Sequence, residues 1–277
     1  MSRPFLKMNG AGNDFAVVEA RSQPFAPDAA QVRAIADRAG PSGCDQLIAI
    51  EPSDKADAFM RIWNAQGGQV DACGNATRCV GWLLLEEANK DAAVIETNAG
   101  LLSIERAGPL QVRVDMGEPK LEWWQIPLSR PMDTVSLDLF AEPELAMPGA
   151  VSMGYPHVVF FVADVADFPV EAAGSKLEFH PLFPQQVNVG FAEIKARDRI
   201  RLRVWERGAG LTKACGTGAC AALVAAARRG LTERRATVEM DGGDLVIEWR
   251  ESDNHVLMTG PVELEYSGVL DLGPVAA

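Results

Sequence analysis

The feature that most limits the fold of this chain is a short segment that occurs twice. In both places a cysteine is followed by a glycine, a polar residue and a run of apolar residues that predicts a buried helix. The first helix is predicted over 75–89 and the second, rich in alanine, over 221–229 with Gly230 as its end. The two cysteines, Cys73 and Cys215, are 142 positions apart, about half of the 277-residue chain. This spacing indicates an internal duplication.

Short apolar runs on both sides of these helices predict strands. They lie at 15–18, 46–50, 59–63, 94–97, 101–106 and 111–114 in the first half, and at 158–162, 187–194, 199–205, 237–240, 245–249 and 256–258 in the second. A further helix is predicted over 27–39, with Gly40 as its stop. The segment 117–148 is rich in proline and weakly patterned, which is typical of a domain junction or a long excursion.

The composition excludes several classes of protein. A net charge of −12 and a pI near 4.8 argue against a general nucleic-acid binder, which needs basic patches to meet phosphates. No stretch approaches the roughly 18 apolar residues of a membrane span, and the N-terminus lacks the apolar run of a signal peptide. We therefore expect a cytoplasmic protein with no membrane and no nucleic-acid partner. Its five cysteines, an odd number, are expected to be reduced thiols.

Each repeated cysteine is predicted at the start of a helix. The glycine after it lets a ligand approach the backbone closely, and Asn75 and Thr217 belong to residue types that cap helices. A helix N-terminus has unpaired amide groups and a partial positive charge, which lower the pKa of a thiol from about 8.5 toward neutrality. The same amides can bind a carboxylate. Two such sites facing each other would place two thiols around one small anion.

This arrangement suits the inversion of a carbon that lies beside a carboxylate. One thiolate removes the proton from that carbon, and the thiol on the opposite face returns a proton. Backbone amides aimed at the carboxylate stabilise the charge that develops in the transition state. In principle the reaction needs no pyridoxal phosphate, metal or other cofactor.

Other uses of the cysteines fit the pattern less well. Cys73 and Cys215 could be buried structural thiols, but their duplicated context favours catalysis. Cys79 and Cys220 lie one to two turns inside their helices, and we expect them and Cys44 to be packing residues. A zinc site built from the four helix cysteines is disfavoured by the five-residue gap between the first two, so no metal site is predicted. A redox protein would need a Cys-x-x-Cys motif, which is absent.

The motifs of the chain also match a known family. They are KMNGAGNDF (7–15), DQ (45–46), WNA (63–65), DACGNATRC (71–79), GYPH (154–157), VNV (187–189), WERGAG (205–210) and CGTGAC (215–220). In this order and over nearly the whole chain, the sequence resembles the diaminopimelate epimerases, which are two-thiol amino-acid racemases independent of pyridoxal phosphate.

The resemblance implies an α/β (α+β) fold with two similar, pseudo-symmetric domains, each of mixed strands wrapped around a central helix. The domains are expected at 1–117 plus 262–277, carrying Cys73, and at 118–261, carrying Cys215. It also implies a homodimer that closes on its substrate, and an isomerase that interconverts LL- and meso-diaminopimelate on the route to lysine and peptidoglycan.

The resemblance further implies the roles of individual residues. Cys73 and Cys215 match the acid/base pair, and His157 and Glu206 match groups that lie near the thiols and tune them. The positions that match substrate contacts are Asn13, Gln46, Asn64, Gly74, Asn75, Asn188, Glu206, Arg207, Gly216 and Thr217, with the glycines, Asn75 and Thr217 contributing backbone amides to the reacting carboxylate.

Three positions depart from the family pattern. Tyr155 stands where an asparagine usually helps to hold the distal carboxylate of the substrate, whereas Asn9 and Ala76, which replace a common histidine and a common glycine, do not touch the expected chemistry. Tyr155 favours an alternative in which the two thiols racemise another amino acid, of histidine or proline type. Asn64, Asn188 and Arg207, which match the distal clamp, count against it, and the retention of both cysteines counts against a member that only binds.

Overall fold

The structure of the protein is a computed structural model that describes residues 2–142 and 145–271. The chain forms two compact units. The first contains the described residues up to Val114 and from Gly260 onward, and the second runs from Asp115 to Thr259. The chain therefore leaves the first unit once and returns to it with its last strand.

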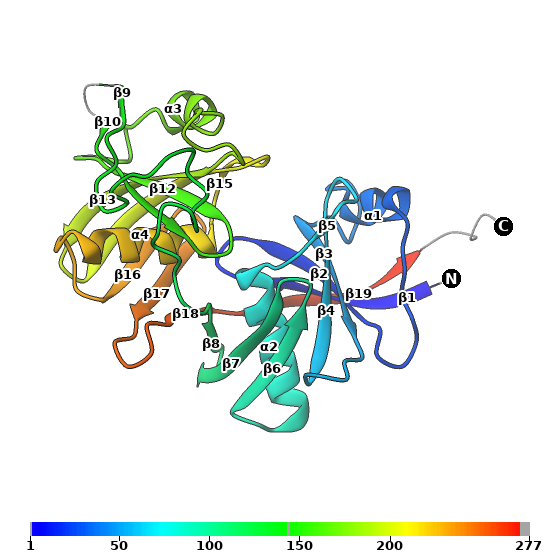
Figure 1. Cartoon of the computed structure of the whole chain (residues 1–277). Helices are drawn as coiled ribbons and strands as arrows, with labels where there is room; N and C mark the ends of the chain where they lie inside the picture. Colours follow the sequence, from blue (N-terminus) through cyan, green and yellow to red (C-terminus); the bar gives the residue numbers. More distant parts are fainter. Residues whose placement is uncertain (1, 143–144, 272–277) are drawn as a thin grey trace. The chain divides into compact units, whose positions relative to one another are not determined.

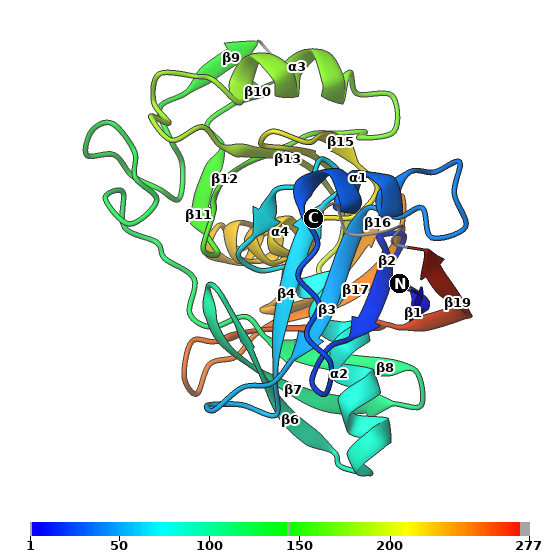
Figure 2. The same ribbon diagram turned by 90° about the vertical axis from the view of Figure 1, so that its right-hand side faces the viewer.

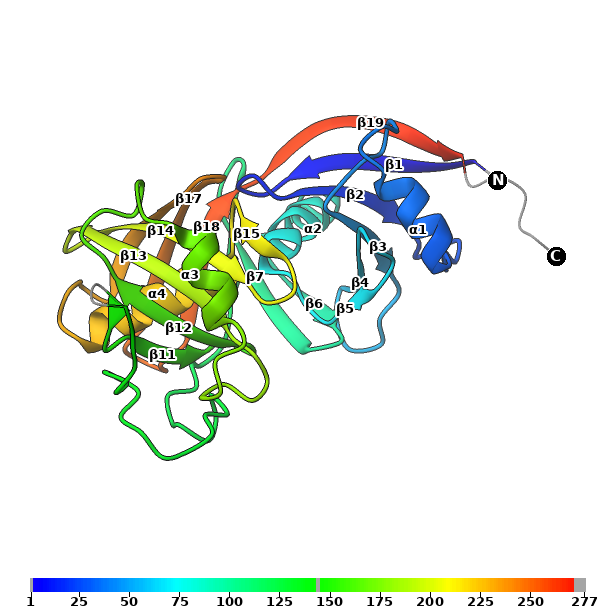
Figure 3. The same cartoon turned by 90° about the horizontal axis from the view of Figure 1, so that it is seen from above.

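The first unit consists of mixed strands around one helix, α2 (Figures 1 and 3). Its elements are β1 (Ser2–Asn9), β2 (Asp14–Glu19), α1 (Ala29–Ala36), β3 (Gln46–Glu51), β4 (Ala58–Asn64), β5 (Gln69–Val70), α2 (Gly74–Ala88), β6 (Ala92–Thr97), β7 (Gly100–Gly108), β8 (Gln111–Asp115), which reaches the boundary, and β19 (Glu263–Asp271). Strand β1 lies between β2 and β19 and is antiparallel to both.

The second unit has the same plan around α4, which packs against strands on several sides (Figure 2). Its elements are β9 (Phe140–Glu142), β10 (Leu145–Ala146), β11 (Gly149–Ser152), β12 (Pro156–Phe161), α3 (Val170–Leu177), β13 (Asn188–Ala196), β14 (Arg199–Glu206), β15 (Gly210–Thr212), α4 (Gly216–Arg228), β16 (Arg235–Met240), β17 (Gly243–Trp249) and β18 (Val256–Pro261), which crosses the boundary.

The two units repeat one order of strand pairing. In the first, β2 runs parallel to β3 and β4 parallel to β6, while β1–β2, β3–β4, β4–β5, β6–β7 and β7–β8 are antiparallel. The second repeats every one of these directions from β11 to β18. The register repeats as well, because Leu47 pairs with Trp63 as Val189 pairs with Trp205. The expected fold of two repeated halves is confirmed.

Each central helix is apolar enough to be enclosed. In α4 an unbroken buried run from Gly218 to Ala226, mostly alanine, lets strands approach from several sides. In α2, Gly81 leaves room for β7, because a Cβ atom there would lie 2.5 Å from Cδ1 of Ile104 on that strand. Helix α1 begins after Asp28, whose carboxylate caps the N–H groups of the first turn. It ends at Ala36, earlier than predicted.

Several elements were not predicted from the sequence, and their patterns explain why. Strand β1 carries charged or exposed residues between its buried ones, and the described side chains of β19 are mostly exposed, so neither strand shows a continuous apolar run. Helix α3 has Gly174 in its interior, which lowers helix propensity, but a Cβ atom there would lie 2.4 Å from Cβ of Trp205. Among its described residues, the proline-rich segment 117–148 holds only the short strands β9 and β10, and β11 begins directly after it at Gly149. Residues 143–144 lie outside the described part.

Candidate active site

The two repeated cysteines are the N-cap residues of the two central helices. Cys73 precedes α2 and Cys215 precedes α4, both with extended backbone (φ −147° and −127°). Their carbonyl oxygens accept the first main-chain bonds of the helices, from the N–H groups of Thr77 and Ala219, each at 2.9 Å. The three N–H groups that precede these donors have no intrahelical acceptor, because none exists in a first helical turn. Each thiol therefore lies beside a ready anion-binding turn.

In the first unit, strand register brings the predicted residues to the end of the unit where Cys73 lies. Phe15 pairs with Gln46, and Gln46 pairs with Asn64, so these residues form one row across β2, β3 and β4. Asn13 directly precedes β2, and its Oδ1 accepts a hydrogen bond from Cys73 Sγ at 3.7 Å. The arrangement gathers a thiol and three amide side chains from four separate segments.

The amides of the first unit differ in what they offer a ligand. Oε1 of Gln46 is buried and has no hydrogen-bond partner in the described part of the chain. Oδ1 of Asn64 accepts the N–H groups of Gln66 and Gly68 at 3.1 and 2.9 Å, so its Nδ2 is the group able to bind a ligand. Asn75 is buried, its Oδ1 accepts a hydrogen bond from Arg78 Nη1 at 3.0 Å, and its backbone N–H belongs to the first turn of α2.

In the second unit, Cys215 is buried beside a carboxylate. Glu206 ends β14, Thr212 Oγ1 donates a hydrogen bond to its Oε1, and the Cys215 thiol also bonds to this carboxylate. Burial raises the pKa of Glu206. Burial, together with the negative charge of Glu206, raises the pKa of Cys215 well above its usual value, although a bond to Thr217 acts in the opposite direction. The pair thus consists of a thiol whose neutral form is favoured and a carboxyl group to which it is hydrogen-bonded.

His157 reaches this thiol through a hydroxyl. Oγ1 of Thr217 lies 3.1 Å from His157 Nε2 and 3.6 Å from Cys215 Sγ. The imidazole is 1% exposed, and burial, with a smaller effect of the positive charge of Arg207, lowers its pKa to about 3. His157 is therefore neutral near pH 7 and can act as a hydrogen-bond partner without carrying charge.

Asn188 and Arg207 hold the loop that follows Glu206. Oδ1 of Asn188 accepts the backbone N–H of Arg207 at 2.9 Å, and its Nδ2 donates to the carbonyl of Pro156 at 3.2 Å. Nη1 of Arg207 donates to the carbonyl of Gln185 at 2.8 Å, and its guanidinium carbon lies 5.4 Å from the centre of the Tyr155 ring. Tyr155 therefore packs on the side chain predicted to clamp the substrate.

The constant offset of 142 positions relates the two half-sites residue by residue. His157 pairs with Asn188 as Phe15 pairs with Gln46, so His157 occupies the place of a phenylalanine in the first unit. By the same offset Tyr155 corresponds to Asn13, Glu206 to Asn64 and Thr217 to Asn75. The two half-sites thus share one backbone arrangement but differ in their side chains, because the ionisable His157 and Glu206 occur only on the Cys215 side.

Three residues near the site were not singled out from the sequence. Thr212 donates to Glu206, and Asp45 accepts a bond from Asn13 at 2.8 Å. Glu178 is a buried carboxylate that accepts Trp205 Nε1 at 2.7 Å and the Gly208 N–H at 3.0 Å, and so holds the loop on both sides of the Glu206–Arg207 pair. Only Asp45, adjacent to Gln46 in a matched motif, carried a signal in the sequence.

The other cysteines are packing residues, as predicted. Cys44, Cys79 and Cys220 are buried, and burial raises the pKa of Cys44 to about 11 and that of Cys79 to about 12. In residues 2–142 and 145–271, no group of three or more His, Cys, Asp or Glu side chains is placed to hold a metal ion. Within the same residues, no helix is both long and apolar enough to cross a membrane.

Comparison with known proteins gives one consistent family. The family model described as diaminopimelate epimerase matches residues 5–122 and 149–265. The protein named diaminopimelate epimerase in Phenylobacterium zucineum (strain HLK1) is 65% identical over 273 residues, which cover 98% of each chain. Proteins with the same name in Acidiphilium cryptum (strain JF-5) and Caulobacter vibrioides (strain NA1000 / CB15N) are 58% and 57% identical, over 99% and 98% of each chain respectively.

Solved structures with low sequence identity share the fold. A PhzF-family phenazine biosynthesis protein of Bacillus anthracis has a TM-score of 0.69 at 14% identity, covering 98% of this chain and 99% of that one. A probable proline racemase of Agrobacterium radiobacter K84 has a TM-score of 0.69 at 17% identity, covering 99% and 94%. A hydroxyproline epimerase of Agrobacterium vitis has a TM-score of 0.68 at 17% identity, covering 97% and 91%.

Proposed function

The chain belongs to the diaminopimelate epimerase family, and on this premise we propose that it interconverts LL- and meso-diaminopimelate with Cys73 and Cys215 as the two bases. The observation that carries the proposal is the placement of both cysteines at the N-caps of the central helices. It supports one thiol and one anion-binding turn per unit. The domains predicted at 1–117 plus 262–277 and at 118–261 are the proposed catalytic halves.

The proposed reaction starts with the substrate carboxylate on the N–H groups of Gly74–Asn75 and Gly216–Thr217. One cysteine, as thiolate, takes the α-proton, and the electron pair left on the carbon is delocalised into the carboxylate. The other cysteine, as thiol, gives its proton to the opposite face of that carbon. The centre is inverted, the two sulfur atoms have exchanged protonation states, and no proton is gained or lost overall. Preorganised amides of this kind contribute about 3 kcal/mol each to the transition state.

In the half that contains Cys215, we propose that the carboxylate of Glu206 acts as the base that deprotonates the thiol. Transfer of the thiol proton from Cys215 to Glu206 would produce the thiolate at the moment of reaction, and the raised pKa of Glu206 makes this carboxylate a better acceptor. His157 is proposed to support the same thiol through the Thr217 hydroxyl. The chemistry of these side chains supplies both proton transfers, so we propose a reaction without cofactor or metal.

The distal part of the substrate is proposed to bind Asn13, Gln46, Asn64, Asn188 and Arg207. The buried, unsatisfied Oε1 of Gln46 and the Nδ2 of Asn64 suit an amino-acid group that both donates and accepts hydrogen bonds. The name shared by the close relatives supports diaminopimelate as the substrate. The alternative, a proline- or histidine-type amino acid, is favoured only by Tyr155, which packs against the proposed clamp Arg207. We also propose that the enzyme is a cytoplasmic homodimer.

The test of substrate and reaction is proton NMR of reduced, cofactor-free enzyme in deuterium oxide. LL-diaminopimelate, L-histidine and L-proline are placed in separate tubes. The proposal expects loss of the α-proton signal and formation of the meso isomer in the first tube alone. Exchange in the histidine or proline tube alone would overturn the substrate and leave the two-thiol chemistry. Sedimentation of the same sample tests the dimer, because a monomer that is fully active would contradict it.

A further inference from the structure

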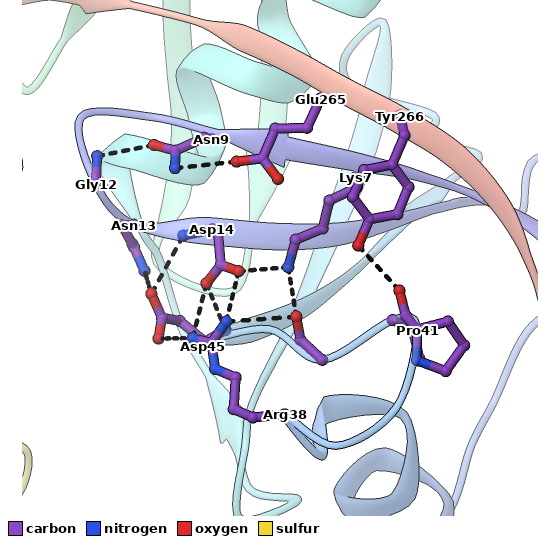
Figure 4. Close-up of polar contacts among 12 residues, drawn as sticks. Lys7, Asn9, Gly12, Asn13, Asp14, Arg38, Pro41, Asp45, Glu265 and Tyr266 are labelled. Atoms are coloured by element: carbon purple, nitrogen blue, oxygen red, sulfur yellow. Dashed lines mark hydrogen bonds and ion pairs between the residues drawn. The ribbon is translucent and has the colours of Figure 1, made fainter.

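A charged network supports the loop that carries Asn13 (Figure 4). The ammonium group of Lys7, which is 4% exposed, donates to the Asp14 carboxylate. The guanidinium group of Arg38 donates to both oxygens of Asp14 and to Oδ1 of Asp45. Burial opposes ionisation of Asp14, but the bonds from Arg38 and Lys7 hold the pKa of this carboxyl well below its usual range. Arg38 thus bridges the carboxylates of Asp14 and Asp45, and Lys7 is a second cation on Asp14.

Asp45 decides which way the amide of Asn13 points. Its Oδ2 accepts hydrogen bonds from Asn13 Nδ2 at 2.8 Å and from the Asp14 N–H at 3.2 Å. An ionised carboxylate can only accept, so the NH₂ end of the amide must face Asp45. The carbonyl end is therefore turned the other way, and this Oδ1 lies 3.7 Å from Cys73 Sγ. The orientation of the amide follows from the charge on Asp45.

The loop around Asn13 has little freedom to undo this orientation. The Asn13 carbonyl accepts the Gly10 N–H at 2.9 Å, and Asn9 Oδ1 accepts the Gly12 N–H at 2.8 Å. At Gly10 the loop lies directly on the first turn of α2, since a Cβ atom there would be 2.9 Å from the Asn75 carbonyl oxygen. The backbone of the loop thus lies against the helix that begins after Cys73, and the side chain of Asn13 is held by Asp45.

We propose that Asp45 is a positioning residue that holds the carbonyl oxygen of Asn13 toward Cys73 and so keeps this thiol protonated at rest. The inference rests on the proposed two-thiol function, in which a protonated cysteine is the proton donor. An S–H group can donate to Asn13 Oδ1, whereas a thiolate would face the lone pairs of that oxygen. A hydrogen bond that only the neutral form can make opposes ionisation.

The first unit carries other ionisable groups near Cys73. Asp71 lies two residues before it, and Cys79, with Arg78 and Glu265 in its electrostatic surroundings, lies on the next turns of α2. None of these groups is altered by a change at position 45, so they form a constant background for the comparison. The effect of Asp45 can therefore be isolated by substitution.

The test is the pH dependence of iodoacetamide alkylation at Cys73, resolved from the other cysteines by peptide mass spectrometry. In Asp45→Asn the side chain has one acceptor oxygen, which Arg38 retains as the stronger donor, so the Asn13 amide can turn its N–H toward sulfur. The sulfur of Cys73 would then face a hydrogen-bond donor instead of an acceptor, which stabilises the thiolate and lowers the pKa of Cys73 by about one unit. Because the thiolate is the reactive form, alkylation at neutral pH should become roughly tenfold faster. An unchanged profile in Asp45→Asn would overturn the proposal.

Two control variants separate this effect from lost charge and lost stability. Asp14→Asn removes one negative charge from the same network but leaves the bond between Asp45 and Asn13. Asp57 resembles Asp45 in that it binds a cation, Lys90, and a backbone N–H group, that of Val94, but in the described part of the chain it makes no hydrogen bond to Asn13. Asp57→Asn therefore controls for the loss of such contacts. We expect the shift in Asp45→Asn to exceed that in Asp14→Asn, and no shift in Asp57→Asn. Equal shifts in Asp45→Asn and Asp14→Asn would mean that charge alone acts, and would contradict the proposal.

A double-mutant cycle with Asn13→Ala completes the test. Without the amide, Asp45→Asn should shift the Cys73 profile no more than Asp14→Asn does, and a full shift in that background would also contradict the proposal. Failure of the proposed function is read separately, from α-proton exchange by the wild-type enzyme. If the wild type exchanges and the alkylation shift is absent, only the role of Asp45 fails. If the wild type does not exchange, the two-thiol function fails whatever the alkylation profile.

Discussion

Replacing Glu206 with glutamine should make Cys215 more acidic and the enzyme slower at the same time. Thr212 donates to one oxygen of Glu206, and glutamine keeps an oxygen for this bond while it presents an N–H to the sulfur. Loss of a like charge and gain of a donor both favour the thiolate. Because these two contributions add in a buried site, we expect the pKa of Cys215 to fall by about 1–3 units in Glu206→Gln.

The reaction should nevertheless become slower, because an amide cannot take the Cys215 proton away and return it. A positioned general base contributes about 10²–10⁴-fold to a rate, so we expect a fall of at least about 100-fold in α-proton exchange. The rate is measured by NMR in deuterium oxide. The pKa of Cys215 is measured from thiolate absorbance as a function of pH. The absorbance of the Glu206→Gln enzyme that also carries Cys215→Ala is subtracted from that of Glu206→Gln, so that the difference reports Cys215.

The matched control is Glu233→Gln, which removes a carboxylate of the second unit that pairs with Arg197 at the surface. It should change neither the exchange rate nor the thiolate absorbance. An exchange rate in Glu206→Gln within about threefold of the wild type would refute the role given to Glu206. A slower enzyme with an unchanged Cys215 pKa would show that the carboxylate and the thiol are not coupled as the structure indicates.

Three further predictions concern the second unit. Glu178→Gln should lower kcat more than it raises KM, measured by steady-state kinetics, because the carboxylate holds the loop next to Trp205 rather than the substrate. Gly174→Ala should cost about 1–3 kcal/mol in urea unfolding, since the new methyl group would overlap the Cβ of Trp205. The pKa of His157 is about 6.5 in the unfolded chain but about 3 in the folded protein, so the free energy of unfolding decreases as the pH falls below about 6.5. Between pH 7 and 5, the free energy measured by urea unfolding should decrease by about 2 kcal/mol more in the wild type than in His157→Phe.

The sequence located the two half-sites because their signal is local. A cysteine, a glycine and a capping-type residue before an apolar run predict a helix start, and repetition of this pattern at Cys73 and Cys215 predicts two equivalent starts. The strands of both halves follow from short apolar runs for the same reason. Strand β1 and the last strand, β19, were missed because neither has a continuous apolar run and because they pair with each other across the whole length of the chain.

The roles of the supporting residues could not be predicted, because these roles depend on distant contacts. Glu178 is separated from Trp205 by 27 positions and from Gly208 by 30, and nothing around it in the sequence announces a buried carboxylate. Asp45 is separated from Asn13 by 32 positions, and only the parallel pairing of β2 with β3 brings the two together. The difference between the two half-sites, with His157 and Glu206 on the Cys215 side alone, likewise becomes clear only when the strand registers of the two units are compared.

The central claim, two thiols acting on opposite faces of one carbon, is tested most directly by deuterium exchange in the single variants Cys73→Ala and Cys215→Ala. Each variant is incubated in deuterium oxide with LL-diaminopimelate and, separately, with the meso isomer. The account predicts that neither variant interconverts the isomers, and that any slow exchange by the remaining thiol is confined to an L centre in one variant and a D centre in the other. Interconversion at the wild-type rate by either variant, or exchange at the same centre in both, would contradict it.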